Sequence, residues 1–392
     1  MQSLPITREH PFDPPATLMR LAGEGPLHPL SFPDGHVGWL VTRMATARAV
    51  LSDARFSARQ ELRHMPYPHP LGQESMTPAI PGWFIRMDPP RHTRYRRLLT
   101  GQFTVRRINQ LIPRIEQITE ERLDAMARAG SPADLVHDFA LPIPSLVICE
   151  LLGVPYADRE EFQHTTATAL KLDADRDDVI AALMSLNDFF VRLVAAKRDN
   201  PADDLLSGLV QSGELDDEEL RAIGMLLLVA GHETTANMLA LGSWTLLRHP
   251  GQLAALRANP GLIDNTVEEL LRYLSIIQFG AQRAALEDVW LDGTLIKAGQ
   301  TLVVSIPAAN RDESRFGEPD TLDLTRETAG HLGFGHGVHQ CLGQQLARVE
   351  MRVGYTALFR RFPELRLVVP DEEVPLRTDM AIYGVHRLPV AF

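Results

Sequence analysis

The sequence predicts a mainly α-helical fold with a smaller β part. Residues 105–200 hold four segments that read as helices, punctuated by prolines. Residues 217–248 form one long apolar segment whose only ionisable residues between Arg221 and Arg248 are His232 and Glu233. Residues at about 27–60, 286–306 and 365–392 show alternation or turn signals, which predicts strands. We expect these elements to form a single domain over residues 1–392.

Composition narrows the class of protein. The chain has 392 residues, of which 45% are hydrophobic and 23% charged, so it can bury a large core. The net charge of −11 argues against a nucleic-acid partner. Two cysteines, Cys149 and Cys341, imply no disulfide framework and suit a reducing compartment. The N-terminal residues contain no apolar segment, so we expect a cytoplasmic protein without a membrane partner. We also expect a monomer.

The N-terminal third begins with a predicted hairpin. In PLSFPDGHVGWLVT the turn signal is Pro33–Asp34–Gly35, and a short helix follows in MATARAVLSD. Residues 65–81 are rich in proline and glycine and predict a loop. Asp88 and two prolines then precede a predicted helix. On it, His92 and Arg96 are four residues apart and share a face that could hold carboxylates or simply face solvent.

The long helix carries the motif AGHETT at its middle. Asp216 and Glu219 predict a capping box at its start, and Pro250 with Gly251 predicts its end. A buried Glu233 is costly unless it is paired or protonated. The hydroxyl of Thr234 can bond back to the preceding turn, where Ala230 and Gly231 leave room for a ligand. A zinc-protease helix is excluded because Ala236 replaces the second histidine; a structural glutamate stays an alternative.

A second pair of charged residues lies in DNTVEELLRYL. Glu269 and Arg272 are three residues apart on a predicted helix. Taken alone, such a pair predicts an ordinary surface ion pair worth roughly 0.2–0.5 kcal/mol.

The stretch FGHGVHQCLGQQLAR, residues 334–348, places one cysteine between a glycine-rich loop and a predicted helix. Gly335, Gly337 and Gly343 allow sharp bends and the close approach of a bulky group. A cysteine just before a helix N-terminus favours a thiolate, which is a metal ligand or a nucleophile. Three interpretations stay open: a core cysteine, a zinc site with His331, His336 and His339, and a haem-iron ligand.

The pattern Phe-Gly-x-Gly-x-His-x-Cys-x-Gly-x-x-Leu-Ala-Arg resembles the haem-binding signature of the cytochrome P450 superfamily, in its soluble bacterial, actinobacterial-type class. The resemblance implies the P450 fold, with haem b (iron protoporphyrin IX) between a long central helix and the helix after the cysteine loop. It makes Cys341 the proximal ligand, with Phe334 and Gly343 beside the haem. The implied propionate partners are His92, Arg96, Arg283 and His339.

Other motifs resemble parts of the same family. AGHETT is similar to its oxygen-binding motif, which implies catalytic roles for Glu233 and Thr234 and places Ala230 and Gly231 next to the haem. Glu269 and Arg272 resemble its structural Glu-x-x-Arg motif. By the same resemblance, Ile277 and Phe279, in the segment that follows this motif, would line the substrate pocket.

The implied activity is that of a monooxygenase that uses O2 and two electrons to hydroxylate or epoxidise a lipophilic molecule. The electrons would come from NAD(P)H through a ferredoxin reductase and a ferredoxin, which basic residues 91–107 and 348–361 would dock. The stretch DPPRHTRYRRLLTGQFTVRR resembles members that tailor polyketides, macrolides or terpenoids. A peroxide-driven peroxygenase, against which the Glu233–Thr234 pair argues, and a non-catalytic haem or zinc protein stay as alternatives.

Overall fold

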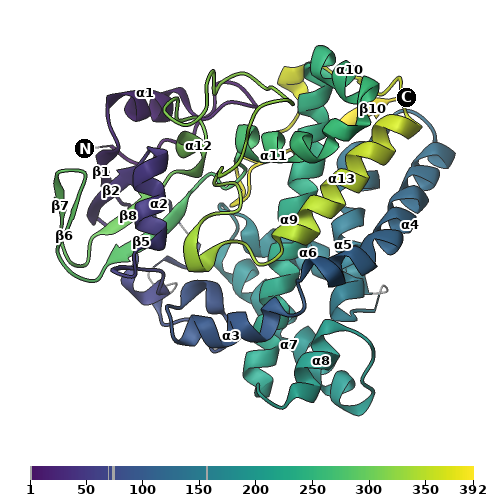
Figure 1. The fold of residues 1–392 in the computed structure, drawn as a ribbon. Helices are drawn as coiled ribbons and strands as arrows, with labels where there is room; N and C mark the ends of the chain where they lie inside the picture. The colour runs from purple at the N-terminus through teal and green to yellow at the C-terminus, as the bar shows by residue number, and fades with distance from the viewer. Residues whose placement is uncertain (1, 69, 73–75, 156–157) are drawn as a thin grey trace. The chain divides into compact units, whose positions relative to one another are not determined.

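The computed structural model describes all residues except 1, 69, 73–75 and 156–157 (Figure 1). The chain forms two compact units, each made of segments that are distant in the sequence. The sheet unit comprises residues 1–79, 85–88 and 249–342. The helical unit comprises residues 80–84, 89–248 and 343–392.

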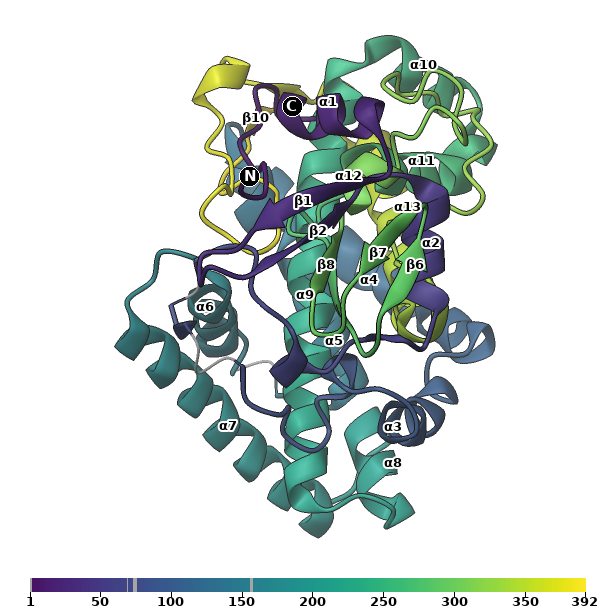
Figure 2. The same cartoon turned by 90° about the vertical axis from the view of Figure 1, so that its left-hand side faces the viewer.

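A five-stranded sheet, in the order β1-β2-β8-β5-β3, organises the sheet unit (Figure 2). The predicted hairpin is confirmed as β1 and β2, which pair antiparallel, whereas β2 and β8 pair parallel. A separate hairpin joins β6 and β7. The strands are β1 Leu27–Ser31, β2 Val37–Val41, β3 Phe56–Ser57, β5 Ala281–Ala285, β6 Val289–Leu291, β7 Thr294–Ile296 and β8 Thr301–Val304. The helices are α1 Ala16–Glu24, α2 Met44–Ser52, α10 Pro250–Ala258, α11 Ile263–Leu274 and α12 Ile306–Ala309, with 3-10 turns η1 Gln60–Leu62, η6 Pro260–Leu262 and η7 Gly337–His339.

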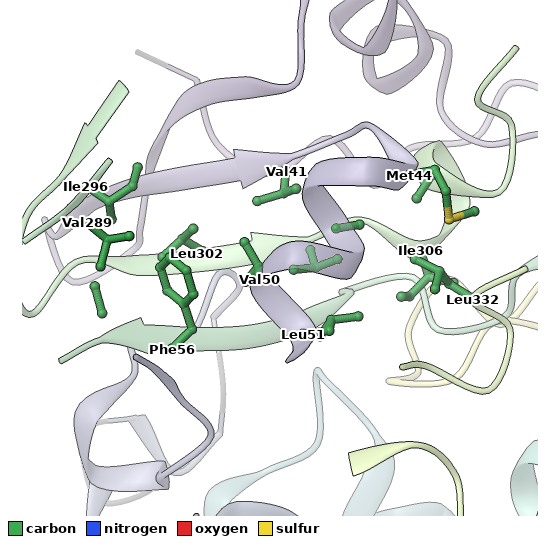
Figure 3. Close-up of a cluster of buried hydrophobic side chains, with 14 of the residues drawn as sticks. Val41, Met44, Val50, Leu51, Phe56, Val289, Ile296, Leu302, Ile306 and Leu332 are labelled. Atoms are coloured by element: carbon green, nitrogen blue, oxygen red, sulfur yellow. The ribbon is translucent and has the colours of Figure 1, made fainter. Parts of the chain in front are cut away.

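One apolar cluster joins this sheet to helix α2. Val50 and Leu51 of α2 share it with Phe56 of β3 and Leu302 of β8 (Figure 3). The predicted helix in MATARAVLSD is therefore amphipathic, with one side buried in the core of the sheet unit. The close approach of β2 and β8 requires a glycine at position 38, because a Cβ at Gly38 would lie 2.1 Å from the Thr301 carbonyl oxygen.

The helical unit is built around α9, Asp217–Arg248, which packs against α5, α7 and α13 (Figure 1). Its start is the predicted capping box: the Asp216 carboxylate accepts from the Glu219 N–H at 2.9 Å, and the Glu219 carboxylate accepts from the Asp216 N–H at 3.0 Å. The other elements are α3 Arg91–Thr100, α4 Val105–Ala129, a π-helical turn η4 Val136–Ala140, α5 Pro142–Leu152, α6 Arg159–Leu170, α7 Arg176–Asp199, α8 Leu205–Ser212, α13 Gln344–Arg361, the 3-10 turn η8 Asp371–Glu373, and a small sheet of β4 Ala133–Asp134, β10 Pro389–Ala391 and β9 Arg366–Leu367.

One described helix, α7, is long and apolar enough to cross a bilayer by length and composition, with a mean hydropathy of 1.7 over its most apolar window. It packs against α6, α8 and α9 inside the helical unit. A core helix passes the same test of length and composition.

The structure differs from the sequence predictions in three places. Pro250 ends α9 as predicted but also occupies the first position of a further helix, α10, which the prediction missed. Residues 365–392 carry only two short strands, β9 and β10, fewer than the alternation predicts. The Asp88 carboxylate does not cap α3; it accepts from the Ser57 hydroxyl at 2.5 Å and the Ala58 N–H at 2.8 Å.

Candidate functional site

Cys341 lies at the end of a closed loop, three residues before α13 begins at Gln344. Its N–H donates to the Phe334 carbonyl oxygen at 2.9 Å, which closes the loop that starts at that phenylalanine. The cysteine is in no disulfide and is partly exposed. Cys149, by contrast, is fully buried in α5 and belongs to the core of the helical unit.

The three glycines of this stretch serve different ends. Gly335 and Gly337 have φ of 71° and 73°, a region that disfavours side chains. Gly337 also packs closely, because a Cβ there would lie 2.4 Å from the Leu51 carbonyl oxygen. Gly343 has an ordinary φ of −83°, and a Cβ there would meet nothing within 4 Å. Gly343 therefore lies in a turn that needs no positive φ, and the glycine leaves open space.

Helix α9 has one exposed window in its otherwise buried middle. Ala230 is exposed, and Val229, Gly231 and Thr234 are half-buried, whereas residues 222–228 and 235–246 are buried. The Thr234 hydroxyl donates to the Ala230 carbonyl oxygen at 2.8 Å, which is the predicted bond to the preceding turn. A Cβ at Gly231 would lie 2.9 Å from Cδ1 of Ile148, so this glycine lets α5 pack. Its predicted place beside a cofactor stays a prediction.

Glu233 belongs to a buried polar network on the same helix. Its Oε2 lies 2.8 Å from Nη2 of Arg377, and both side chains are nearly inaccessible to solvent. The Nδ2 of Asn237 donates to the Glu233 carbonyl oxygen at 2.7 Å. His232 bonds to the Leu228 carbonyl oxygen and to the Thr166 hydroxyl, and its burial lowers its pKa. The cost of a buried glutamate, noted from the sequence, is thus offset by an arginine.

Arg377 was missed by the sequence analysis. It lies 144 residues from Glu233, in a stretch without a recognisable motif, so no local signal marks it.

The predicted propionate partners are two histidines and two arginines, distributed over the two units. In the helical unit, His92 of α3 is buried, and Arg96, one turn later, is half-buried. In the sheet unit, Arg283 at the centre of β5 is 8% exposed, and burial lowers its pKa to about 10. His339, at the end of η7, is half-buried. Inward-facing donors of this kind suit carboxylates.

Glu269 and Arg272 form a fully buried ion pair, unlike the surface pair that their spacing alone predicts. Two bonds, of 2.7 and 2.8 Å, join the guanidinium to the carboxylate, and both side chains are 0% exposed. Arg272 also donates to the carbonyl oxygens of Asn310 and Pro319, and Arg326 lies 3.2 Å from the Glu269 carboxylate. The pair therefore ties α11 to the segment that leads to the cysteine loop.

The predicted pocket walls occupy the segment between α11 and β5. Phe279 is buried against Tyr67, with ring centroids 4.0 Å apart, and Ile277 is half-buried. A cavity of about 670 Å³ in the sheet unit is lined by N-terminal residues and by Phe32, Pro66 and Tyr67. Tyr67 thus connects this cavity to Phe279.

The donor set distinguishes between haem and zinc. Among the described residues, no group of three or more His, Cys, Asp and Glu side chains could hold a metal ion. A haem needs only one axial cysteine from the protein, plus donors for its carboxylates and open space for its ring. In the sheet unit, Cys341 is partly exposed and Arg283 is buried. In the helical unit, Gly343 leaves open space, α9 has its exposed window, and His92 is buried. The residues present therefore fit a haem.

Comparisons with known proteins agree with this site. The family model "Cytochrome P450" matches residues 172–385. The chain is 53% identical to Cytochrome P450 105C1 of a Streptomyces species over 396 residues, covering 100% of both chains. It is 44% identical to pentalenic acid synthase of Streptomyces avermitilis, covering 100% of this chain and 97% of that protein. The crystal structure of CYP105P1 in complex with filipin I matches with a TM-score of 0.93 and 43% identity, over 100% of this chain and 98% of that one. The chain therefore belongs to the cytochrome P450 family, has the P450 fold and is a P450 monooxygenase.

Proposed function

We propose that this P450 hydroxylates or epoxidises a lipophilic secondary metabolite, such as a polyketide, macrolide or terpenoid. It would use O2 and two electrons delivered from NAD(P)H by a ferredoxin reductase and a ferredoxin. Relatives named for secondary metabolism, such as pentalenic acid synthase, support this substrate class. The structural observation that carries the proposal is the partly exposed Cys341 at the end of its closed glycine loop.

Each residue of the proposed haem site would have a distinct role. A bound haem with a cysteine thiolate supplies oxygen activation, because the thiolate favours O–O cleavage. Cys341 would be that ligand, and Arg96, Arg283, His92 and His339 would hold the propionates. The Thr234 hydroxyl donates its hydrogen bond to the Ala230 carbonyl oxygen. Its oxygen lone pairs could therefore accept a hydrogen bond from a water in the α9 window. Thr234 would position that water as a proton donor. Glu233, the preceding residue, would be the acid that supplies protons to it.

The carbon monoxide spectrum of the reduced protein tests the proposal. The wild-type protein should give the strongly red-shifted Soret band of a cysteinate haem. Cys341→Ser should lose that band, whereas Cys149→Ala, the matched control at the second cysteine of the chain, should keep it. A wild-type protein that binds haem without the red shift would contradict the assignment of Cys341. Turnover with hydrogen peroxide alone, at the rate seen with ferredoxin, would favour the peroxygenase.

Charges on α13 support the proposed ferredoxin site. Arg360 and Arg361 pair with Glu120 and Asp124 of α4. Arg352 lies on the same helix, within the basic segment 348–361 that the sequence assigns to ferredoxin docking. We expect Arg352→Glu to slow reduction by ferredoxin, most strongly at low ionic strength. Arg128→Glu, at an exposed arginine of α4, is the control. An unchanged rate and salt dependence in Arg352→Glu would remove this site.

We also propose that the protein works as a monomer in the cytoplasm. The net charge of −11 supports a soluble, self-repelling protein. Sedimentation analysis at micromolar concentration checks the monomer, and a dimer would contradict it.

A further inference from the structure

The turn that opens the cysteine loop begins at Leu332. The Leu332 carbonyl oxygen accepts from the Gly335 N–H at 2.8 Å, and the loop then closes where the Cys341 N–H donates to the Phe334 carbonyl oxygen. The Leu332 side chain is buried and packs with Ile306 in the apolar cluster of the sheet unit (Figure 3). The position of Leu332 therefore determines where the loop leaves the core.

A buried asparagine holds the backbone of Leu332. The Leu332 N–H donates to Oδ1 of Asn310 at 2.7 Å, and Nδ2 of Asn310 donates to the Ser275 hydroxyl at 2.8 Å. The guanidinium of Arg272 donates to the main-chain oxygen of Asn310 at 2.9 Å. Asn310 is fully buried at the C-terminal end of α12, and Ser275 follows the last residue of α11. The amide of Asn310 thus bridges the start of the cysteine loop and the end of α11.

The direction of each hydrogen bond in this chain is determined. A backbone N–H can only donate, so the amide oxygen of Asn310 faces Leu332 and the amide nitrogen faces Ser275. Because that nitrogen donates, the Ser275 hydroxyl accepts from it and donates its own hydrogen bond to the Arg272 carbonyl oxygen at 2.9 Å. Both side chains are needed to satisfy these buried polar groups.

Ser275 has a backbone conformation that is rare for a residue with a side chain. Its φ of 44° and ψ of 68° lie in the left-handed region, which favours glycine or asparagine. The residue is buried, and its hydroxyl has the two partners described above. These bonds offset the strain of a left-handed serine, a kind of strain that persists where the surrounding structure requires it.

We propose that Asn310 and Ser275 are positioning residues, which hold the cysteine loop and the predicted pocket wall in a fixed relation to each other. The predicted walls, Ile277 and Phe279, follow two and four residues after Ser275. The loop starts at Leu332, on the other side of the Asn310 amide. All of these residues belong to the sheet unit, so the link acts within one compact unit.

A fixed relation between wall and loop matters for the reaction. A misplacement of about 1 Å between a substrate and the group that reacts with it can cost on the order of 10²-fold in rate. This inference rests on the proposed function, because it takes Cys341 as the haem ligand and Ile277 and Phe279 as walls of the pocket.

Three variants of the purified holoprotein test the link. Asn310→Ala removes both hydrogen bonds of the amide, and Ser275→Ala removes the hydroxyl alone. Ser275→Gly removes the hydroxyl but relieves the left-handed backbone, so it decides the question if the other two fail to fold. Thr266→Val is the matched control. Thr266 is fully buried on α11, and its hydroxyl donates to the Leu262 carbonyl oxygen at 2.9 Å, outside the chain of bonds described above.

Two spectra report the two ends of the link. The share of the reduced haem that gives the red-shifted Soret band with carbon monoxide reports the cysteine loop. The ratio of the dissociation constants of imidazole and 4-phenylimidazole, from spectral titration, reports the pocket wall, because the two probes differ only in the phenyl ring. The denaturation midpoint of each variant measures its overall stability.

We expect Asn310→Ala to lower the share of the red-shifted band and to reduce the preference for 4-phenylimidazole about fivefold. Both Ser275 variants should reduce that preference to a similar extent. They should affect the band less, because Asn310 can still accept from Leu332. Thr266→Val should lower the denaturation midpoint and leave both spectral quantities unchanged.

Two results would overturn the link. One is wild-type values of both spectral quantities in Asn310→Ala and Ser275→Gly, whatever their stability, because the residues would then be merely structural. The other is a wild-type preference for 4-phenylimidazole in every variant with a change in the band alone, because the amide would then hold only the loop. Failure of the proposed function would show separately, as a missing red-shifted band in the wild-type protein.

Discussion

The carboxylate of Glu233 and the guanidinium of Arg377 face each other at 2.8 Å in the buried interior of the helical unit. Glu233 is 2% and Arg377 8% exposed. The pair joins the middle of α9 to a segment that follows η8, and backbone bonding continues from Arg377 to the Gly384 carbonyl oxygen. The motif residue proposed to deliver protons is therefore also a structural anchor.

Removing Arg377 alone should destabilise the fold more than removing the charges of Arg377 and Glu233 together. Arg377→Leu leaves Glu233 buried without its partner, so we expect a loss of about 3–5 kcal/mol in the free energy of unfolding. The double variant Glu233→Gln/Arg377→Leu should recover part of that loss, because no buried charge remains. Denaturant unfolding followed by circular dichroism measures both.

Arg248→Gln is the control for this prediction. Its pair with Asp371 lies at 2.6 Å but is more than a third exposed on both sides, so its loss should cost at most about 1 kcal/mol. Equal losses of unfolding free energy in Arg377→Leu and Arg248→Gln would show that the buried pair stabilises the fold no more than the exposed pair does.

The buried pair Glu269–Arg272 leads to a second stability prediction. Glu269→Gln leaves Arg272 and Arg326 without a counter-charge, so we expect a loss of about 3–5 kcal/mol. The loss should appear as a lower denaturation midpoint in haem-free and haem-loaded protein alike, because the pair stabilises the fold and has no role in the reaction. Glu24→Gln breaks an exposed i,i+4 pair with Arg20 and should cost about 0.5 kcal/mol or less. A comparable small loss in Glu269→Gln would rule out the structural role.

The sequence predicted those features that local physics determines. Helix α9 begins and ends where the capping box and the proline placed it, because Asp216, Glu219 and Pro250 act within one turn of the chain. The hairpin β1–β2 followed from its Pro33–Gly35 turn in the same way.

Features that depend on distant segments were not accessible from spacing. The burial of Arg272 follows from the carbonyl oxygens of Asn310 and Pro319, which lie 38 and 47 residues away. Arg377 lies in no motif, because its role comes from its three-dimensional neighbour Glu233 alone. Strands β9 and β10 have only two and three residues, so most of the segment 365–392 lacks the strands that its sequence pattern predicts.

Thr234 leads to a prediction about the coupling of electrons to product. Its Oγ1 donates to Ala230, so the lone pairs are free to accept from a water in the α9 window. Thr234→Ala removes them, and we expect the product formed per NAD(P)H to fall by roughly tenfold or more, since positioned proton transfer contributes on the order of 10²–10⁴-fold. The lost electrons should appear as hydrogen peroxide.

Thr234→Ser is the matched variant, because it keeps the hydroxyl and loses only a methyl group. It should retain most of the coupling. If the serine variant uncouples as strongly as the alanine variant, shape rather than the hydroxyl would explain the effect.

His36 makes part of the stability depend on pH. Its ring stacks on His64 with centroids 3.6 Å apart, and its Nε2 accepts from the Thr301 N–H at 3.1 Å. Burial is the first cause that lowers the pKa of His36, the neighbouring His64 lowers it further, and Asp34 opposes both. The neutral ring is therefore favoured in the folded state. Because the folded pKa lies below the unfolded value of about 6.5, this stabilisation is present above pH 6.5 and is lost as the pH falls from there through the lowered pKa.

His36→Gln isolates this contribution. The glutamine oxygen can accept from the Thr301 N–H but does not titrate, so unfolding free energies measured between pH 7.5 and pH 5 should fall less steeply than in the wild-type protein. His137→Gln, at a histidine whose side chain is 83% exposed, should leave the wild-type slope unchanged. A slope in His36→Gln equal to that of the wild type would assign the acid sensitivity to other groups, since the stacked pair would then bind protons equally in the folded and unfolded states.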